Sequence, residues 1–207
     1  LDRLSSNSSP LEQYSGPFEL NADEFVIARA IKDDKPYGSE IFQEFCKHSE
    51  VIVEPTYVST YSEHYTGGGA FALVDGKRGS DKFRDGNWQG FWGDDLDITI
   101  EYSHLQEGKE ELYTRFYQYS NSWIMMPTKV QVWVSRDGKD WSLVDAVSLE
   151  TKDTDRGEIR ENISIELSPK EVFKFVRLKA DNYGVLPSWH EAAGSKAWLF
   201  IDEIQIK

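Results

Sequence analysis

The chain has 207 residues, with 23 Lys and Arg against 36 Asp and Glu, and a formal net charge of −13. This charge excludes binding to a nucleic-acid backbone, which requires a basic patch that displaces counterions. Aromatic residues make up 14% of the chain, so some rings are expected to face solvent or a ligand rather than the core. The sequence has no apolar run of about 18 residues, the length that would predict a membrane-spanning helix.

Alternating apolar and polar residues, interrupted by turn residues, recur along the chain and predict an all-β fold. No long segment keeps a helical period. The segment 168–174 is expected to hold at most one helical turn before a strand, and SRDGKDW is expected to form a tight hairpin. The predicted strands, in chain order, are 25–32, 97–102, 128–135, 162–167, 173–180 and 198–207.

A domain boundary is predicted near residue 50, within the polar stretch CKHSEVIVEP (46–55), which precedes a long glycine-rich opening. A segment of about 50 residues rarely buries a sandwich core alone. Residues 1–50 are therefore interpreted as the remnant of a larger β domain, and residues 51–207 as a complete β-sandwich. If the first unit lacks strands, its exposed sheet edge predicts self-association of the chain.

The single cysteine, Cys46, excludes an internal disulfide and any site built from several cysteines. Cysteine is among the residue types that are most often buried, so a core position is favoured over a reactive thiol. The histidines show no metal-binding spacing such as HxxxH. They are His48, His64, His104 and His190.

An adjacent carboxylate pair, Asp202 and Glu203, lies in the last predicted strand. Successive side chains of a strand point to opposite faces, so the two carboxylates are expected not to address one substrate. No other pair of acid and base, or of nucleophile and base, can be assembled from the sequence. We therefore predict no catalytic residues in this chain.

Several segments from Tyr57 onward follow a familiar order: YVSTYSEHYTGGGAFALVDGKRGS, DGNWQGFWGDDLDITIEY, SWIMMPTKVQVWVSRDGKDW, FVRLKADNYG and WHEAAGSKAWLFIDEIQI. This order resembles the C-terminal discoidin domain of bacterial β-N-acetylhexosaminidases (chitobiases), within the coagulation-factor type C superfamily. The preceding SPLEQYSGPFELNADEFVIARAI is similar to the small fibronectin-like sandwich before that domain. The resemblance implies a discoidin-type jelly-roll β-sandwich over 51–207, preceded by a short incomplete β-sandwich segment over 1–50.

Relatives of this domain in glycosidases serve as carbohydrate-binding modules. The resemblance thus implies a noncatalytic module that recognises terminal N-acetylhexosamine or galactose-type sugars. It also implies the catalytic domain of a parent hexosaminidase as a partner, and a secreted, periplasmic or outer-surface location in a bacterium. The alternative is a structural module that packs on the catalytic domain, or drives oligomerisation, without binding a glycan.

Sugar binding requires flat apolar rings that stack on a pyranose, flanked by donors and acceptors for its hydroxyls. The stretches 83–95, 118–123 and 181–190 combine such residues in predicted loops. In discoidin domains, loops at one end of the sandwich converge on the ligand. The candidate sugar-binding residues are Arg84, Asn87, Trp88, Trp92, Tyr119, Asn121, Trp123, Tyr183, Trp189 and His190.

Each of these rings also has a structural alternative, because tryptophan is usually well buried. Trp88 and Trp198 lie next to predicted strands and favour the core. Trp189 and His190 follow Pro187 in a polar loop and are expected to be the most exposed of the set. A hydrogen-bonded structural role stays the alternative for His190.

The loop LVDGKRGS carries Asp75 and Ser80, which in related discoidin domains surround a structural calcium ion together with a Glu of the last strand, here Glu203. Carboxylates, a hydroxyl and loop carbonyls are the hard oxygen ligands that calcium prefers. The alternative is that Asp75 forms an Asx-turn and Glu203 is an ordinary strand residue. Lys77 and Arg78 in the same loop would oppose a cation if they turned inward.

Overall fold

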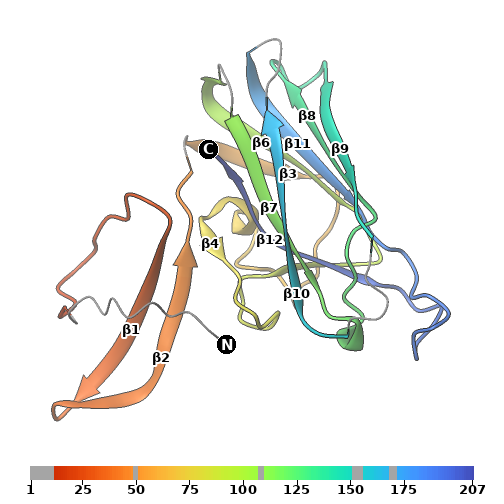
Figure 1. Cartoon of the computed structure of the whole chain (residues 1–207). Helices are drawn as coiled ribbons and strands as arrows, with labels where there is room; N and C mark the ends of the chain where they lie inside the picture. The colour runs from red at the N-terminus through yellow and green to blue at the C-terminus, as the bar shows by residue number, and fades with distance from the viewer. Residues whose placement is uncertain (1–11, 49–50, 107–109, 151–155, 168–171) are drawn as a thin grey trace.

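A computed structural model describes residues 12–48, 51–106, 110–150, 156–167 and 172–207 (Figure 1). The strands are β1 (Glu24–Lys32), β2 (Lys35–Phe45), β3 (Ile52–Tyr57), β4 (Lys77–Arg78), β5 (Gln89–Trp92), β6 (Leu96–Gln106), β7 (Glu110–Gln118), β8 (Lys129–Ser135), β9 (Ser142–Ser148), β10 (Ile159–Leu167), β11 (Phe173–Asp181) and β12 (Trp198–Ile206). Two 3-10 turns, η1 (Ala72–Val74) and η2 (Ser120–Ser122), interrupt them. Within the described ranges, no helix has the length and apolar character needed to cross a membrane.

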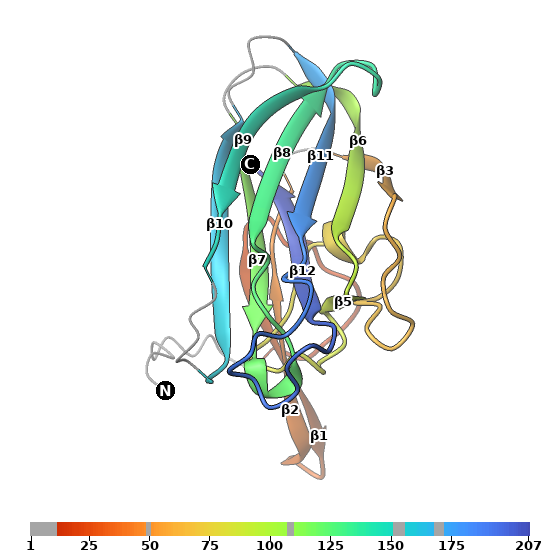
Figure 2. The same ribbon diagram turned by 90° about the vertical axis from the view of Figure 1, so that its right-hand side faces the viewer.

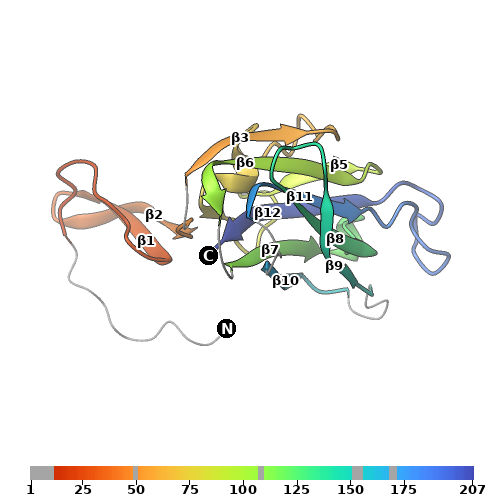
Figure 3. The ribbon, with the colours of Figure 1, turned by 90° about the horizontal axis from the view of Figure 1, so that it is seen from above.

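Two antiparallel sheets form the body of the molecule (Figures 2 and 3). One sheet has the order β3-β6-β11-β8-β9, and the other has the order β10-β7-β12-β5. Alternate residues of the strands point between the sheets, which is the pattern that the sequence predicted. The predicted β-sandwich is therefore confirmed.

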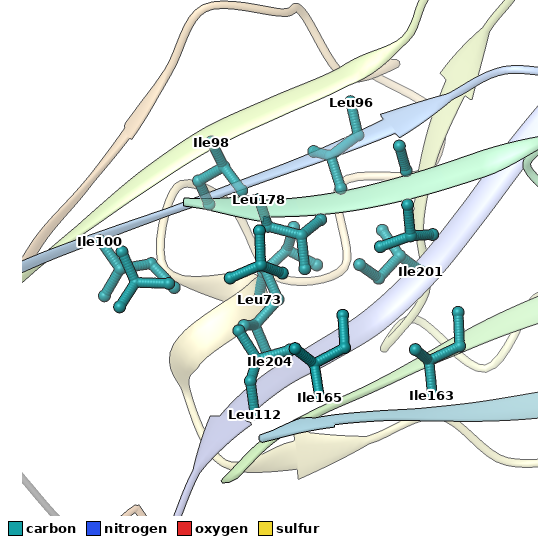
Figure 4. Close-up of a cluster of buried hydrophobic side chains, with 14 of the residues drawn as sticks. Leu73, Leu96, Ile98, Ile100, Leu112, Ile163, Ile165, Leu178, Ile201 and Ile204 are labelled. Atoms are coloured by element: carbon teal, nitrogen blue, oxygen red, sulfur yellow. The ribbon is translucent and has the colours of Figure 1, made fainter. Parts of the chain in front are cut away.

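The core between the sheets consists mainly of aliphatic side chains (Figure 4). Ile98 of β6 and Leu178 of β11 come from the five-stranded sheet, and they meet Ile165 and Ile201 of the four-stranded sheet; all four are 1% exposed or less. Leu73 of η1 is also fully buried in this cluster, so the loop before β4 is anchored in the core. This packing makes the sandwich a rigid support for its connecting loops.

All six predicted strands are present, within a few residues of the expected bounds. The predicted hairpin between β8 and β9 is confirmed, with Gly138 at a φ of 75°. The expected strand entry after 168–174 is confirmed from Phe173 onward, whereas 168–171 lie outside the described residues. The hairpin prediction implied β9 without bounds, and β2, β3, β4, β5 and β7 were not among the predicted strands.

Strand β12 contains a bulge that changes the directions of Asp202 and Glu203. Ile201 is opposite Phe116 and Ile204 is opposite Thr114, so β12 has one residue more than β7 between these pairs. An extra residue in a strand breaks the alternation of side chains. Both carboxylates line one cavity beneath the loop that holds β4. The expectation that they point to opposite faces is therefore wrong.

Strands β1 and β2 form a hairpin that projects away from the sandwich (Figures 1 and 3). Its two-residue turn, Asp33 and Asp34, has positive φ at both positions, as type I′ hairpin turns require. Among the described residues, the short strand β4 continues the sheet of this hairpin, in the order β1-β2-β4. The interpretation of 1–50 as a remnant of a fibronectin-like domain stays a prediction, and 1–11 and 49–50 lie outside the described residues.

Candidate functional site

A cavity of about 320 Å³ opens at the end of the sandwich where η2 lies. Its walls come from four segments: the loop after β3, the loop between β4 and β5, the η2 region, and the start of β12. The lining residues are Tyr65, Phe83, Arg84, Asn121, Ser122, Trp123, Ile124, Trp198 and Phe200. Five of these nine residues are aromatic, so the cavity is a ring-lined pocket with a polar rim.

Trp123 is held in an uncommon backbone conformation, with a φ of 64° and a ψ of 15°. Its N–H donates to the Ser120 carbonyl at 2.8 Å, and its own carbonyl accepts from the Trp198 N–H at 2.8 Å. Left-handed backbone in a bulky residue costs about 1–3 kcal/mol and occurs most often at functional sites. The indole also stacks on Trp92, with centroids 5.8 Å apart and planes 21° apart. Ring and backbone are both fixed before any ligand arrives.

The floor of the pocket is a cluster of rings in edge-to-face contact. Tyr65 lies 4.8 Å from Phe200 and 5.3 Å from Trp198, measured between centroids. Phe83 lies 5.7 Å from Phe200 with the planes at 89°. Such contacts are the preferred geometry for aromatic pairs. The rings therefore hold one another in place and keep the pocket from collapsing.

The polar groups of the pocket are Arg84, Asn121 and Ser122. The Arg84 guanidinium lies over the Phe83 ring, 4.9 Å from its centroid, and the side chain is exposed. Asn121 is also exposed, and its amide makes one long contact of 3.5 Å with the Arg156 carbonyl. A guanidinium, an amide and a hydroxyl together provide donors and acceptors for a neutral polar ligand. The lining residues include no carboxylate.

The predicted sugar-binding residues divide into three groups. Arg84, Asn121 and Trp123 line the pocket directly. Trp92 supports Trp123 from behind, and Tyr119 packs 6.3 Å from the Phe83 ring. The others lie outside the pocket lining; these are Asn87, Trp88, Tyr183, Trp189 and His190.

Two residues outside the lining have structural roles near the loop before β5. Trp88 is 1% exposed, as its core alternative required, and its indole N–H donates to the Ser80 carbonyl at 3.1 Å. The Asn87 amide donates to Gln43 Oε1 at 3.0 Å, which ties this loop to β2. The segment 83–95 thus supplies one lining pair, and the rest of it supports the pocket.

The expected exposure of Trp189 and His190 is wrong. His190 is 6% exposed, and its Nε2 donates to the Ser120 carbonyl at 2.8 Å while its Nδ1 accepts from the Ala192 N–H at 3.0 Å. Trp189 is half-buried and packs against the cluster around Leu186. The loop after β11 folds back on itself, so His190 contacts η2 and Trp189 packs on the loop's own apolar cluster.

Sequence reasoning missed Tyr65, Phe83 and Phe200, and it assigned Trp198 to the core. Tyr65 directly precedes the TGGG run, and an aromatic residue beside a flexible loop was the signal that could have found it. Trp198 and Phe200 are two residues apart in a strand and point to one face. This face lies outside the main sandwich core at the start of β12, where no sequence pattern marks the change.

The three residues proposed for calcium have other partners. Asp75 Oδ1 accepts from the Lys77 N–H at 2.9 Å, which is the Asx-turn alternative, and the Lys77 ammonium lies 2.7 Å from Oδ2. The Ser80 hydroxyl accepts from the Lys82 N–H at 3.1 Å. The Lys77 ammonium thus contacts one of the carboxylate oxygens that would bind a calcium ion. Calcium binding itself stays a prediction.

A buried charge network fastens the loop of β4 to β12. The Arg115 Nε donates to Asp202 Oδ2 at 2.9 Å and its Nη2 donates to the Gly79 carbonyl at 2.6 Å. Asp202 is fully buried, and this burial raises its pKa to about 6, against the opposing effect of Arg115. Arg115 also lies 5.4 Å from the centroid of the Trp88 ring. The network supports the loop that carries Trp88 and leads to Arg84.

Cys46 and Glu203 are buried beside this network. Burial raises the pKa of the Cys46 thiol to about 12, so the predicted core position is confirmed and the thiol is not activated. Glu203 accepts from the Gly76 N–H at 3.0 Å and contacts His48 Nε2 at 2.9 Å. Burial raises the pKa of Glu203 to about 7, and the hydrogen bond with His48 acts in the opposite direction.

No family model matches the sequence, and no curated protein matches it. Solved structures with a similar fold include a module titled GH31 CBM32-2 bound to GalNAc, with 15% identity and a TM-score of 0.46, covering 75% of this chain and 97% of that one. The C-terminal domain of a chitobiase from Bacteroides fragilis has 17% identity and a TM-score of 0.41, covering 76% and 91%. A CBM32 module of Clostridium perfringens in complex with GalNAc-β-1,3-galactose has 18% identity and a TM-score of 0.42, covering 74% and 93%.

Two of these titles name CBM32 modules, and the third names the C-terminal domain of a chitobiase. At such identities and TM-scores the likeness carries no argument about the ligand of this chain. The sugars in those titles belong to those proteins, and the case for a ligand here depends on the pocket itself.

Proposed function

We propose that this chain is a noncatalytic carbohydrate-binding module whose ligand enters the pocket at Trp123. The observation that carries the proposal is the Trp123 indole, locked in left-handed backbone and stacked on Trp92 at the wall of a ring-lined cavity. Aromatic faces stack on the C–H faces of sugar rings, while neighbouring polar groups select the hydroxyls. Arg84 and Asn121 line the pocket and can form hydrogen bonds with sugar hydroxyls.

The size and charge of the pocket favour one neutral sugar ring. Its volume of about 320 Å³ is at the lower end of the range for small-molecule sites. Arg84 is the single charged lining residue, and a guanidinium can donate to two ring hydroxyls at once. Terminal N-acetylhexosamine or galactose-type sugars are the proposed ligands, because an acetamido methyl group would find a second apolar surface among Tyr65, Phe83 and Phe200.

The wider setting of the module follows from the sequence resemblance. We propose that it is an accessory domain of a bacterial glycoside hydrolase, a β-N-acetylhexosaminidase, and that the catalytic domain of that enzyme is its partner. The proposed location is outside the cytoplasm, where the glycan substrates of such enzymes occur. In this role the module would increase the local concentration of the enzyme at its substrate.

Titration of the whole chain with single sugars tests this function. N-acetylgalactosamine, N-acetylglucosamine and galactose should each be followed by calorimetry and by tryptophan fluorescence, because Trp92, Trp123 and Trp198 meet at the pocket. We expect saturable binding of at least one of them, with a fluorescence change at the same midpoint. Mannose, with a different arrangement of hydroxyls, provides the comparison. Failure of all three sugars to bind would remove the proposed function.

Self-association is the second candidate role, and the hairpin supports it. Phe25, Ile27 and Phe42 are 74%, 48% and 56% exposed on one face, and Tyr37 and Ile41 are 63% and 68% exposed on the other. Apolar surface of this extent on a two-stranded ribbon marks an interaction site. Strand β1 is the edge of its sheet, so its backbone can pair with another strand.

The sequence of β1 is self-complementary in one antiparallel register. If Ala28 is opposite Ala28 of a second copy, Glu24 is opposite Lys32 and Phe25 is opposite Ile31. Opposite charges and apolar pairs both stabilise directly opposed positions. A continuous six-stranded sheet, three strands from each copy, would then join two chains across β1.

Ala28→Lys tests this register, because it places two like charges directly opposite each other at the centre of the pair. Ala30→Lys is the matched control, since in the same register residue 30 is opposite Val26 and the added charge meets no copy of itself. In sedimentation velocity we expect the native chain and the control to share a dimer fraction that Ala28→Lys loses. A native chain that stays monomeric at every concentration would eliminate this role.

A further inference from the structure

We propose that Cys46, His48 and Glu203 form a binding site for a divalent cation of the zinc class. One ligand atom from each residue, a thiol sulfur, an imidazole nitrogen and a carboxylate oxygen, lies within 4.8 Å of the other two. Cys46 is 7% exposed and Glu203 is 2% exposed, and the side chain of His48 is 14% exposed. The three residues belong neither to the sugar pocket nor to the Asp75 loop turn.

The fold brings these three residues together from distant parts of the chain. Cys46 and His48 follow β2 and are two residues apart in extended chain, so both side chains can face the same way. The Cys46 N–H donates to the Gly76 carbonyl at 2.8 Å, and the Gly76 N–H donates to Glu203 at 3.0 Å. The bulge in β12 turns Glu203 toward this point. Gly76 therefore makes backbone hydrogen bonds to both Cys46 and Glu203, which holds these two residues close together.

The donor types select the metal. Zinc is bound in proteins by thiolate, imidazole nitrogen and carboxylate oxygen, usually with four ligands in tetrahedral arrangement. Calcium instead requires six to eight oxygen ligands, and a sulfur and a nitrogen are poor substitutes for them. Three protein ligands leave a fourth position for water. Glu203, which the calcium expectation assigned to Asp75 and Ser80, is thus directed toward Cys46 and His48.

The surroundings of Glu203 also favour a cation. A buried carboxylate is normally paired with a permanent positive charge, because an unpaired buried charge is costly. Among the described residues, the basic side chain in contact with Glu203 is the imidazole of His48, whose Nε2 lies 2.9 Å from Oε1. The second ring nitrogen, His48 Nδ1, is buried and has no hydrogen-bond partner among the described residues. A metal ion would supply the missing charge.

Arg78 lies beside the Cys46 thiol, so its guanidinium places a positive charge at the edge of the cluster. Its Nη2 donates to Gln205 Oε1 at 2.6 Å, and its Nε lies 3.9 Å from Glu44. These contacts hold the Arg78 guanidinium between Gln205 and Glu44. Glu44 and Asp202 lie close enough to offset the charge of Arg78.

The position of the cluster indicates what the ion would do. The end of β2 and the end of β12 lie close together (Figure 1), and the Gln205 amide donates to the Lys47 carbonyl at 2.7 Å. An ion held by Cys46, His48 and Glu203 would link the hairpin to the last strand of the sandwich. Its role would be structural, because a site that stabilises only the folded state raises the stability of that state.

Metal titration of the whole chain, freed of metal by chelation, tests the proposal. Zn²⁺ should bind with one-to-one stoichiometry in calorimetry and raise the melting temperature. Co²⁺, as a spectroscopic substitute, should produce a thiolate-to-cobalt charge-transfer band, because Cys46 is the only thiol of the chain. Ca²⁺ in excess should neither displace Zn²⁺ nor remove the band. Absence of binding, or Co²⁺ binding without a thiolate band, would overturn the proposal.

Cys46→Ser and His48→Gln each remove one ligand with little change of volume. Loss of groups that only orient a ligand costs about 10–100-fold in metal affinity, so we expect the loss of a ligand to weaken Zn²⁺ binding at least about 100-fold. The cobalt band should vanish in Cys46→Ser and persist at higher Co²⁺ in His48→Gln. His64→Gln, at an exposed histidine, is the matched control and should bind as the native chain does. Equal Zn²⁺ affinity in all three variants would mean an adventitious surface ion and would refute the site. Circular dichroism verifies that each variant is folded.

Discussion

Replacing Trp123 by alanine should abolish detectable sugar binding while the sandwich stays folded. The indole forms a wall of the pocket, and its stacking on Trp92 keeps its face turned to the cavity. A ring that stacks on a sugar carries a large share of the binding energy in a small site, typically at least about 2 kcal/mol. Trp123→Ala should therefore reduce affinity by at least about 30-fold, measured by calorimetry with the sugar that binds the native chain best.

Trp141→Ala is the matched control for this prediction. Trp141 lies in the turn between β8 and β9, at the end of the sandwich remote from η2, and its ring contacts Arg177. The same loss of an indole at that place should leave sugar affinity unchanged. If Trp123→Ala binds as tightly as Trp141→Ala, the ligand does not stack on Trp123, and the pocket is the wrong site.

The largest effect on stability is expected from Arg115→Met. Arg115 is the buried cation beside Asp202, whose side chain is fully buried. Removal of one partner leaves an uncompensated charge in the interior, which costs about 3–5 kcal/mol. We expect the free energy of unfolding in urea at pH 8 to fall by about that amount, since methionine fills similar volume without supplying charge.

The pH dependence of that loss gives the prediction a second readout. The pKa of Asp202 is raised from 3.8 to about 6 in the folded chain. Its contribution to stability is therefore fully present below the unfolded value and is lost as the pH rises through about 6. The deficit of Arg115→Met should shrink as the pH falls through that range, because a protonated Asp202 needs no counter-charge. A deficit that is equal at pH 5 and pH 8 would mean that lost packing, not charge, is the cause.

Arg177→Met is the control variant for Arg115→Met. Arg177 donates from both Nε and Nη2 to Asp97 at 2.7 Å, but the two side chains are 27% and 14% exposed. Partly solvated pairs are screened, and such a pair contributes about 0–1 kcal/mol. The same chemical change should therefore have a small effect at the surface. A loss at Arg177 as large as the loss at Arg115 would contradict the role of burial.

Most of the strands that were predicted correctly share a local signal. In β6, β8, β10 and β11 one face meets the core and the other is more exposed, so the alternation is visible in the sequence, whereas β12 is buried on both faces and was recognised by its apolar residues. The missed strands lack it for identifiable reasons. Strand β7 is buried on both faces over Phe116 and Tyr117, and the hairpin strand β2 is exposed on both faces. When both faces of a strand are buried, or both are exposed, apolar and polar residues no longer alternate along it.

The sugar pocket was partly predictable for a similar reason. Arg84, Asn121 and Trp123 lie in loops where aromatic and polar residues alternate, and this pattern identified them. Phe200 and Trp198 lie in a strand and look like core residues, because sequence cannot tell where a strand leaves the interior. His190 was placed in solvent because its loop is polar, yet that loop folds over η2 and buries the ring.

The sequence by itself determined that the chain is an all-β sandwich with ring-bearing loops, because alternation and turn chemistry are local properties. Only the tertiary structure decided which side chains meet. The bulge of β12 directed Asp202 and Glu203 to one side, and the return of that strand past β2 brought Glu203, 155 residues away in the chain, to His48. Contacts at such separation depend on register and on a single extra residue in a strand, and neither leaves a periodic trace in the sequence.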